Sequence, residues 1–416
     1  MNARHARVVR MAYLVASVAG VAFFAMSVAL LGIWPGRVLE AQSRAMAPEH
    51  VLTLTASEQR GREIYSREGC AYCHTQQIRY LHADMLRFGA PTLAWETRLD
   101  YPHLWGTRRI GPDLAREGGT HTADWHFAHL FSPRAIVPDS VMPRYASLFD
   151  GAADRPRQSA RDLLAYLETL GRARELAGPE GEAHAREACD CAGDEMRTMA
   201  LAGTTPLNAA PARPRPRGDA PEVPVVSDLG RGRALFAANC VGCHGVTGAG
   251  DGAGAATLRP FPPNLTEHTY TRTRVVDALW NGVAGTSMQA WRDYALADLA
   301  ALADYVRSLD ATANGDPVAA QQLALGADVY AANCVQCHGA AGDGRGPAVA
   351  ELRIAPTDFR AQRASVATAV RALATGVAGT QMAPWTDRLS DEQRVAVAHY
   401  VRSLFQGDGG GRGGDR

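Results

Sequence analysis

The chain opens with a long apolar segment before its pattern becomes mixed. Residues 11–34 contain no charged side chain. At about 1.5 Å per helical residue this segment is about 36 Å long, and a hydrocarbon core is about 30 Å thick. The pattern therefore predicts one membrane-spanning helix over residues 11–34.

Basic residues set the expected orientation of this helix. Arg4, Arg7 and Arg10 precede it, and positive charge favours the cytoplasmic side. We therefore expect a single-pass protein of the bacterial inner membrane, with residues 1–10 in the cytoplasm and the folded domains in the periplasm. The alternative is a cleaved signal peptide with Ala45-Met46-Ala47 as a poor cleavage site. Apolar regions of signal peptides run to only about 7–15 residues, which favours a retained anchor.

An internal repeat dominates the C-terminal half. The segment that ends at Cys240 matches the segment that ends at Cys334, 94 residues later. Each repeat closes with apolar residues spaced three or four apart, which is typical of a helix packed on one face. Glycine and proline fill the middle of each repeat, so we expect small helical domains with long loops.

These patterns predict an all-α chain with three folded domains. Residues 172–226 are rich in Pro, Ala and Arg and lack a regular apolar period, as in a linker, while residues 409–416 are mostly polar and glycine. The predicted division is a cytoplasmic segment (1–10), an anchor (11–34), domain 1 (53–171), a linker (172–226), domain 2 (227–312), domain 3 (321–408) and a disordered tail (409–416).

Each domain carries one C-x-x-C-H motif. Two thiols three residues apart can form thioethers to the two vinyl groups of a haem, and the adjacent histidine can then bind the iron. The motifs predict three covalently attached haem c groups, held by Cys70, Cys73 and His74; by Cys240, Cys243 and His244; and by Cys334, Cys337 and His338. A redox-active disulfide and half of a zinc site are the alternatives. The repeats offer only His268 and His399 as further histidines, which is too few for zinc.

Methionines are the predicted distal ligands. Met288 and Met382 are the only methionines of domains 2 and 3, and each lies 48 residues after the first cysteine of its motif. In domain 1 the candidates are Met142, which lies in a loop before the closing helix, and Met85, which follows His74 too closely to reach the opposite haem face. Five histidines remain competitors there: His82, His103, His121, His126 and His129.

Two weaker patterns accompany the motifs. A proline carbonyl could orient each proximal histidine by accepting its second ring N–H, with Pro112, Pro262 or Pro263, and Pro356 as candidates. Cys189 and Cys191 lie in the linker. They could bind a soft metal such as Cu(I), but an incidental pair or a disulfide is favoured.

Residues 61–148 resemble the mono-haem subunit of cbb3-type cytochrome c oxidases. The resemblance rests on the segments that run from Gly61 to Cys70, from Tyr101 to Gly106, from Gly111 to Gly119, from Asp124 to Leu130 and from Ser132 to Pro143. It implies that Met142 is the distal ligand of domain 1. Domains 2 and 3 resemble the di-haem module of subunit III of the same oxidases. The resemblance therefore implies a fusion of the two cytochrome subunits.

The implied function is electron transfer in a cbb3-type oxidase. The chain would take electrons from a soluble cytochrome c or another periplasmic donor and pass them to a polytopic haem–copper catalytic subunit, since we expect no oxygen-reducing site in the chain itself. The alternatives are the tri-haem cytochrome subunit of a membrane-bound alcohol or sugar dehydrogenase, and a stand-alone periplasmic electron shuttle. The net charge of zero argues against nucleic acid as a partner.

Overall fold

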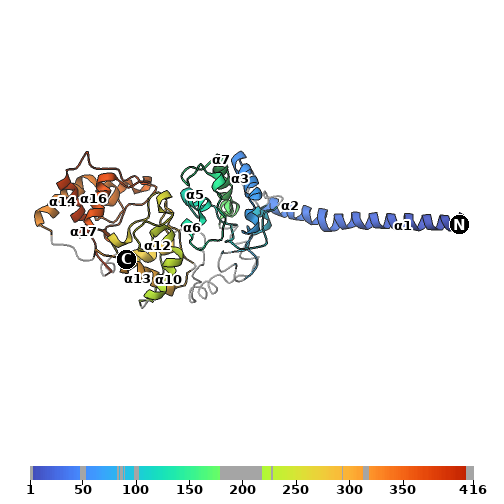
Figure 1. The fold of residues 1–416 in the computed structure, drawn as a ribbon, viewed down its shortest axis with the longest axis horizontal. Coiled ribbons are helices and arrows are strands. Elements are labelled where there is room, and N and C mark those ends of the chain that lie inside the picture. The colour runs from blue at the N-terminus through green and yellow to red at the C-terminus, as the bar shows by residue number, and fades with distance from the viewer. Residues whose placement is uncertain are drawn as a thin grey trace.

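The computed structural model describes residues 3–46, 53–81, 84, 88, 90–97, 103–178, 218–225, 228–292, 294–312 and 318–408. A long N-terminal helix projects from a row of three helical domains, which follow one another in chain order (Figure 1). The predicted all-α class is confirmed, because the only strands in the described part of the chain are two segments of three residues each. Most of the predicted linker and the whole of the predicted tail lie outside the described residues.

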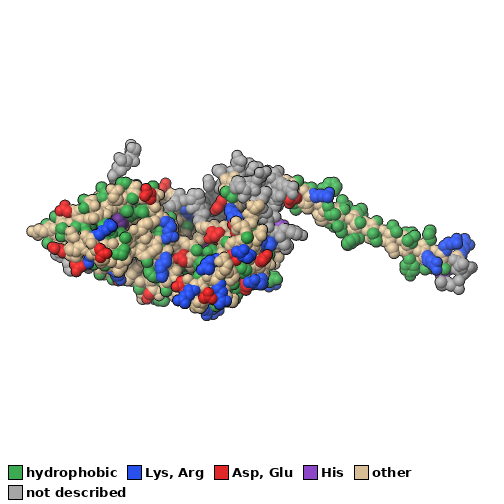
Figure 2. Space-filling model, turned by 90° about the horizontal axis from the view of Figure 1, so that it is seen from above, with side chains coloured by type: hydrophobic (Ala, Val, Ile, Leu, Met, Phe, Trp, Pro, Cys, Tyr) green, Lys and Arg blue, Asp and Glu red, His purple; other side chains and the backbone are tan. Residues whose placement is uncertain are grey.

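The N-terminal helix is longer than the apolar segment that predicted it. It consists of α1 (Ala3–Val28), a five-residue π-helical turn (Ala29–Ile33) and α2 (Trp34–Met46). Pro35 explains the π-helical turn, because a proline ring clashes with the carbonyl four residues earlier, and a wider turn relieves that clash. Residues 4–41 form the one described helix that is long and apolar enough to cross a membrane. Its apolar side chains are exposed along its length (Figure 2).

In each domain, a helix near the start of the domain's sequence packs across a helix near its end. In domain 1 these helices are α3 (Ala56–Arg67) and α7 (Gln158–Leu167). In domain 2 they are α10 (Leu229–Asn239) and α13 (Leu296–Ser308), and in domain 3 α14 (Ala320–Asn333) and α17 (Asp391–Ser403). The predicted closing helices are therefore present.

A glycine allows each of these crossings. A Cβ atom on Gly61, Gly232 or Gly326 would overlap a backbone carbonyl oxygen of the opposite helix. One turn further along, an aromatic pair fills the crossing, and its ring centroids lie 5.3 Å apart in all three domains. The pairs are Tyr65–Tyr166, Phe236–Tyr305 and Tyr330–Tyr400. The three domains thus share one packing solution.

Shorter elements carry the loops between the crossing helices. The α-helices among them are α5 (Ala123–Phe131), α6 (Pro133–Ile136), α11 (Val241–His244), α12 (Arg272–Asn281), α15 (Val335–His338) and α16 (Val366–Thr375). The 3-10 helices span Cys70–Tyr72, Ala94–Thr97, Ala146–Leu148, Ala255–Thr257, Leu265–Glu267 and Pro347–Glu351.

Domains 2 and 3 meet through an antiparallel pair of strands, β1 (His268–Tyr270) and β2 (Gln362–Ala364). Thr269 lies opposite Arg363 at the centre of this pair, and these two residues are related by the repeat offset of 94 (363 − 269). A second contact obeys the same symmetry. Gly285 packs on Arg353, and Gly379, its equivalent, packs on Arg259, the equivalent of Arg353. The two repeats are therefore related by a local two-fold axis.

Domain 1 also packs against domain 2, beside the contact with domain 3. The backbone N–H of Arg259 donates to Oδ2 of Asp124 at 2.7 Å, and the hydroxyls of Thr122 and Ser287 are 2.6 Å apart. The second attachment motif also takes part, because a Cβ atom on Gly242 would overlap the carbonyl oxygen of Ile136 in α6. Domain 2 thus lies between its two neighbours (Figure 1).

Candidate haem sites

The three C-x-x-C-H motifs adopt the same compact turn. In each, the N–H of the histidine donates to the carbonyl of the first cysteine, at 2.9 Å for His74, 2.8 Å for His244 and 2.9 Å for His338. This bond places the two cysteines and the histidine side by side at the end of the domain's first helix. All six cysteines are free and half-buried in the structure.

Burial controls the ionisation of these cysteines. It raises the pKa of Cys240 to about 12 and the pKa of Cys70, Cys243 and Cys334 to about 11. These groups are therefore thiols at neutral pH. Redox-active and zinc-bound cysteines are thiolates, with a lowered pKa. These buried thiols differ from the low-pKa cysteines of redox-active disulfides.

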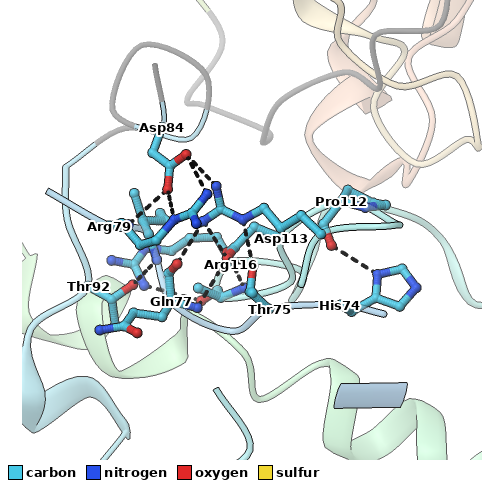
Figure 3. A network of polar contacts seen from close by, with 12 residues as sticks. His74, Thr75, Gln77, Arg79, Asp84, Thr92, Pro112, Asp113 and Arg116 are labelled. Atoms are coloured by element: carbon cyan, nitrogen blue, oxygen red, sulfur yellow. Dashed lines mark hydrogen bonds and ion pairs between the residues drawn. The ribbon is translucent and has the colours of Figure 1, made fainter. Parts of the chain in front are cut away.

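The proximal histidines are oriented through Nδ1. The carbonyl of Pro112 accepts a hydrogen bond from Nδ1 of His74 at 2.9 Å (Figure 3). Nδ1 of His338 bonds to the carbonyl of Thr357 at 3.3 Å, one residue beyond the expected Pro356. Nδ1 of His244 is buried, and no acceptor meets the geometry of a hydrogen bond. The carbonyl of Pro263 is nevertheless close enough to raise the pKa of His244 against the effect of burial. In His74 and His338, where Nδ1 is hydrogen-bonded, Nε2 is the nitrogen available to an iron.

Burial also keeps these imidazoles neutral. It lowers the pKa of His244 to about 4, and it lowers the pKa of His74 and His338 against the opposing effect of their carbonyl partners. A neutral imidazole has the free lone pair that a metal ligand needs.

A network of buried polar side chains holds the loop that carries Pro112. Asp113 is only 1% exposed and accepts from the hydroxyl of Thr75, the N–H of Gln77 and the guanidinium of Arg109. Thr75 follows the proximal histidine directly, so the network joins both sides of the His74–Pro112 hydrogen bond (Figure 3). Its outer part is the ion pair between Arg79 and Asp84, at 2.8 Å.

The three candidate distal methionines lie in loops with one shared hydrogen bond. The N–H of Met142 donates to the hydroxyl of Ser140 at 3.2 Å, and Met288 and Met382 donate to Thr286 and Thr380 at 3.1 Å. The role of these hydroxyl groups was not predicted from the sequence, although a Ser or Thr stands two residues before each methionine. The common turn places Met142 in the same local structure as the methionines of the repeats.

The first two sites open into one cavity of about 1410 Å³. A pocket for a single small ligand usually measures about 300–1,000 Å³. The predicted ligands among the lining residues are Cys70, Cys73, His74 and Met142 from domain 1 and Cys240, Cys243, His244 and Met288 from domain 2. The thiols, the neutral imidazoles and the large shared volume all fit haem groups at these two sites.

The other candidate ligands of domain 1 include three histidines on the wall of the same cavity. His103 stacks on Trp105 at a centroid distance of 4.3 Å. His121, His126 and His129 gather around Trp125 on the cavity wall. Burial lowers the pKa of His126 to about 4 and that of His129 to about 3. Four further candidates lie outside the described residues: His82, Met85, Cys189 and Cys191.

Two protein families match the chain. Residues 5–187 match the family described as cytochrome c oxidase, mono-heme subunit/FixO, and residues 227–306 and 321–401 match cytochrome c oxidase, cbb3-type, subunit III. The chain combines a FixO-type mono-haem region with two cbb3 subunit III cytochrome domains. The FixO-type region includes the anchor and domain 1, and the subunit III-type domains are domains 2 and 3.

Similar curated proteins carry names from the same oxidases. The cbb3-type cytochrome c oxidase subunit FixP of Azorhizobium caulinodans is 30% identical over 206 residues, which cover 46% of this chain and 66% of that protein. Subunit CcoP of Azospirillum sp. is 32% identical and FixP of Bradyrhizobium sp. 30% identical, each over 44% of this chain. The chain thus spans between 61% and 66% of the length of these relatives.

Among solved structures, a chain of the Kuenenia stuttgartiensis reducing HAO-like protein complex Kustc0457/Kustc0458 is 24% identical. It covers 44% of this chain and is itself covered completely, with a TM-score of 0.22. The family matches support an electron-transfer cytochrome role, which fits the chemistry of the sites.

Proposed function

We propose that the chain is the tri-haem cytochrome subunit of a cbb3-type oxidase. Each domain would hold one haem c through two thioether bonds, a proximal histidine and a distal methionine. The proposed ligand sets are Cys70, Cys73, His74 and Met142; Cys240, Cys243, His244 and Met288; and Cys334, Cys337, His338 and Met382.

The cavity shared by the first two sites is the observation that carries this proposal. A haem supplies reversible one-electron chemistry when bound. The protein would fix each ligand, because the cysteines and histidines of the first two sites lie on the walls of a single cavity, which residues of domain 3 such as Pro356 and Thr357 also line. Two redox sites in one cavity suit a chain that carries electrons along its length.

The family matches support a haem–copper catalytic subunit as a partner in this transfer. FixO and subunit III are the cytochrome families that match the two halves of the chain. The chain would take electrons from a soluble cytochrome c or another periplasmic donor at domains 2 and 3. It would deliver them from the His74 site to a haem–copper catalytic subunit. The anchor would hold the domains at the periplasmic face of the inner membrane.

The number of haems is tested first. A pyridine haemochrome assay on fully matured protein should give three haems per chain, and the paired variant Cys334→Ala/Cys337→Ala should give two. Two or fewer haems in the unmodified chain would contradict the assignment of all three motifs.

The partner is tested by purification in mild detergent. The chain should co-purify with a subunit that carries b-type haem and copper, and the complex should consume oxygen when it receives a reduced donor. A His74→Ala variant should stop this turnover while the two C-terminal sites still reduce. A complex with a dehydrogenase and no haem–copper subunit would replace the proposal with the dehydrogenase alternative.

A further inference from the structure

Three side chains of domain 1 converge beside domain 2. Glu117, His121 and His126 each offer one ligand atom, and these three atoms lie within 4.8 Å of one another. Oε1 of Glu117 is 2.7 Å from Nδ1 of His121 and 3.6 Å from Nε2 of His126. The three side chains are only 12%, 10% and 5% exposed, in that order, so water does not solvate the group freely.

The polar groups of this cluster are poorly satisfied. Nε2 of His126 is buried and has no hydrogen-bond partner. Within the described part of the chain, Glu117 has only these two histidines as ion-pair partners. Glu96, another buried carboxylate of domain 1, instead pairs with both Arg116 and Arg174. A buried carboxylate generally requires compensation by a cation.

The tautomer of His121 points to the same need. Its Nε2 contacts Oε1 of Gln289 in domain 2, and because an amide oxygen only accepts, Nε2 carries the hydrogen. In a neutral ring Nδ1 then presents a lone pair to the carboxylate of Glu117. A metal ion between the two atoms, or a proton on Nδ1, would remove the repulsion between these lone pairs. The Trp125 ring stacks on the His121 ring, with the ring centroids 3.6 Å apart, and fixes the plane of the imidazole.

We propose that Glu117, His121 and His126 bind a divalent transition-metal cation of the zinc class at the junction of domains 1 and 2. Two imidazoles and one carboxylate form a ligand set that Zn²⁺ accepts, with a fourth position open to water. Bonds of about 2.0–2.1 Å would set the ligand atoms about 3.4 Å apart in a tetrahedral site. The separation of 3.6 Å between His126 and Glu117 is close to that value, whereas the 2.7 Å between His121 and Glu117 is a hydrogen-bond distance that would open by about 0.7 Å on metal binding.

The bond from His121 to Gln289 gives the cation a structural role. A metal-bound imidazole commonly donates its other N–H to an oxygen, and this hydrogen bond fixes the ring. Here the acceptor belongs to the residue that follows Met288. Metal binding would therefore hold domain 1 against the loop that carries the distal methionine of domain 2.

The test uses the full-length chain purified with its haems. The protein is washed with a chelator, loaded with Zn²⁺ and freed of excess ion, and its zinc and iron are measured by mass spectrometry. We expect about one zinc ion per chain, and at least a tenfold loss of affinity in both Glu117→Gln and His126→Gln. An unchanged visible absorption spectrum would show that these variants retain their haem sites.

Two controls identify the site. The variants His103→Gln and Cys189→Ser/Cys191→Ser should bind zinc as the unmodified chain does. X-ray absorption at the zinc edge should show nitrogen and oxygen ligands and no sulfur, and this result does not depend on any variant folding. The proposal fails if the unmodified chain retains no zinc, if sulfur ligands appear, or if a folded Glu117→Gln variant binds zinc equally well. A protonated His121 paired with Glu117 would then explain the cluster.

Discussion

Gly242 lies against the carbonyl oxygen of Ile136, with no room for a Cβ atom between them. Gly242 belongs to the second attachment motif, and Ile136 precedes the loop of Met142 in domain 1. The equivalent position in the third motif is Gln336, which is exposed. The glycine therefore serves the contact between two domains and is not a requirement of the motif.

Replacing Gly242 should move the candidate haem sites of domains 1 and 2 apart. We expect Gly242→Ala to loosen the junction and to slow reduction of the domain 1 site by at least tenfold in stopped-flow experiments that start from reduced domains 2 and 3. The Gln336→Ala variant changes the matching position of the third motif and should behave as the unmodified chain does. Equal rates in both variants would show that the junction does not govern this transfer.

The distal methionines can be tested by their effect on potential. A thioether ligand stabilises ferrous iron, so Met288→His and Met382→His should each lower the potential of one haem, by on the order of 100 mV. A spectroscopic redox titration of the purified chain measures this shift. Unchanged titrations would place the ligands elsewhere, and Met26→Leu in the anchor controls for a general effect of losing a methionine.

Helix crossing makes Gly232 intolerant of any side chain. Gly232→Ala should destabilise domain 2 by about 1–3 kcal/mol or more, because the added methyl group would overlap the carbonyl of Ala301 and overpacking costs about that much. Gly230→Ala in the same helix is the matched control. Its Cβ would lie 3.2 Å from a side-chain oxygen of Asp228, so we expect a change below about 1 kcal/mol. Thermal unfolding of both variants measures the difference.

Acid should weaken the ion pair between Arg60 in α3 and Asp162 in α7. The guanidinium of Arg60, together with Ser57 and Gln158, holds the pKa of Asp162 below its usual value. A carboxylate with a lowered pKa stabilises the fold above its unfolded pKa of about 3.9, and this contribution is lost as the pH falls further.

Asp162→Asn should therefore lower the unfolding midpoint of domain 1 by a few degrees at pH 7. This difference should persist to about pH 4 and then shrink progressively as the pH falls toward the lowered pKa of Asp162 in the folded state, because the aspartate becomes protonated only there. The control is Asp150→Asn, which removes an exposed carboxylate from the Arg157 ion pair and should leave the midpoint unchanged. A difference between Asp162→Asn and the unmodified chain that does not shrink between pH 4 and pH 2 would contradict the electrostatic explanation.

The sequence predicted those features that depend on local pattern. The apolar segment predicted the long N-terminal helix, the apolar periods predicted helical domains, and the motif segments predicted both families. The ST-type turns before Met142, Met288 and Met382 were also local, and they were overlooked because a single Ser or Thr in a loop is common.

Tertiary contacts could not be predicted in this way. The contact between Gly242 and Ile136 joins residues of two domains that are far apart in the sequence. No local sequence pattern links one of these residues to the other. The acceptor for His338 differs from expectation for a related reason. The loop geometry brings Thr357, and not Pro356, to the imidazole, and a one-residue shift of this kind leaves no trace in spacing or polarity.

The symmetric pairing of Thr269 with Arg363 also bears on the origin of the chain. A surface that pairs with its own copy about a two-fold axis is what a homodimer uses. A one-domain ancestor that already associated with itself would have needed only a tandem duplication to make its partner permanent. Once the copies were joined, each could diverge independently. Domain 2, the first copy, could then gain its contact with domain 1 and keep its pairing with domain 3.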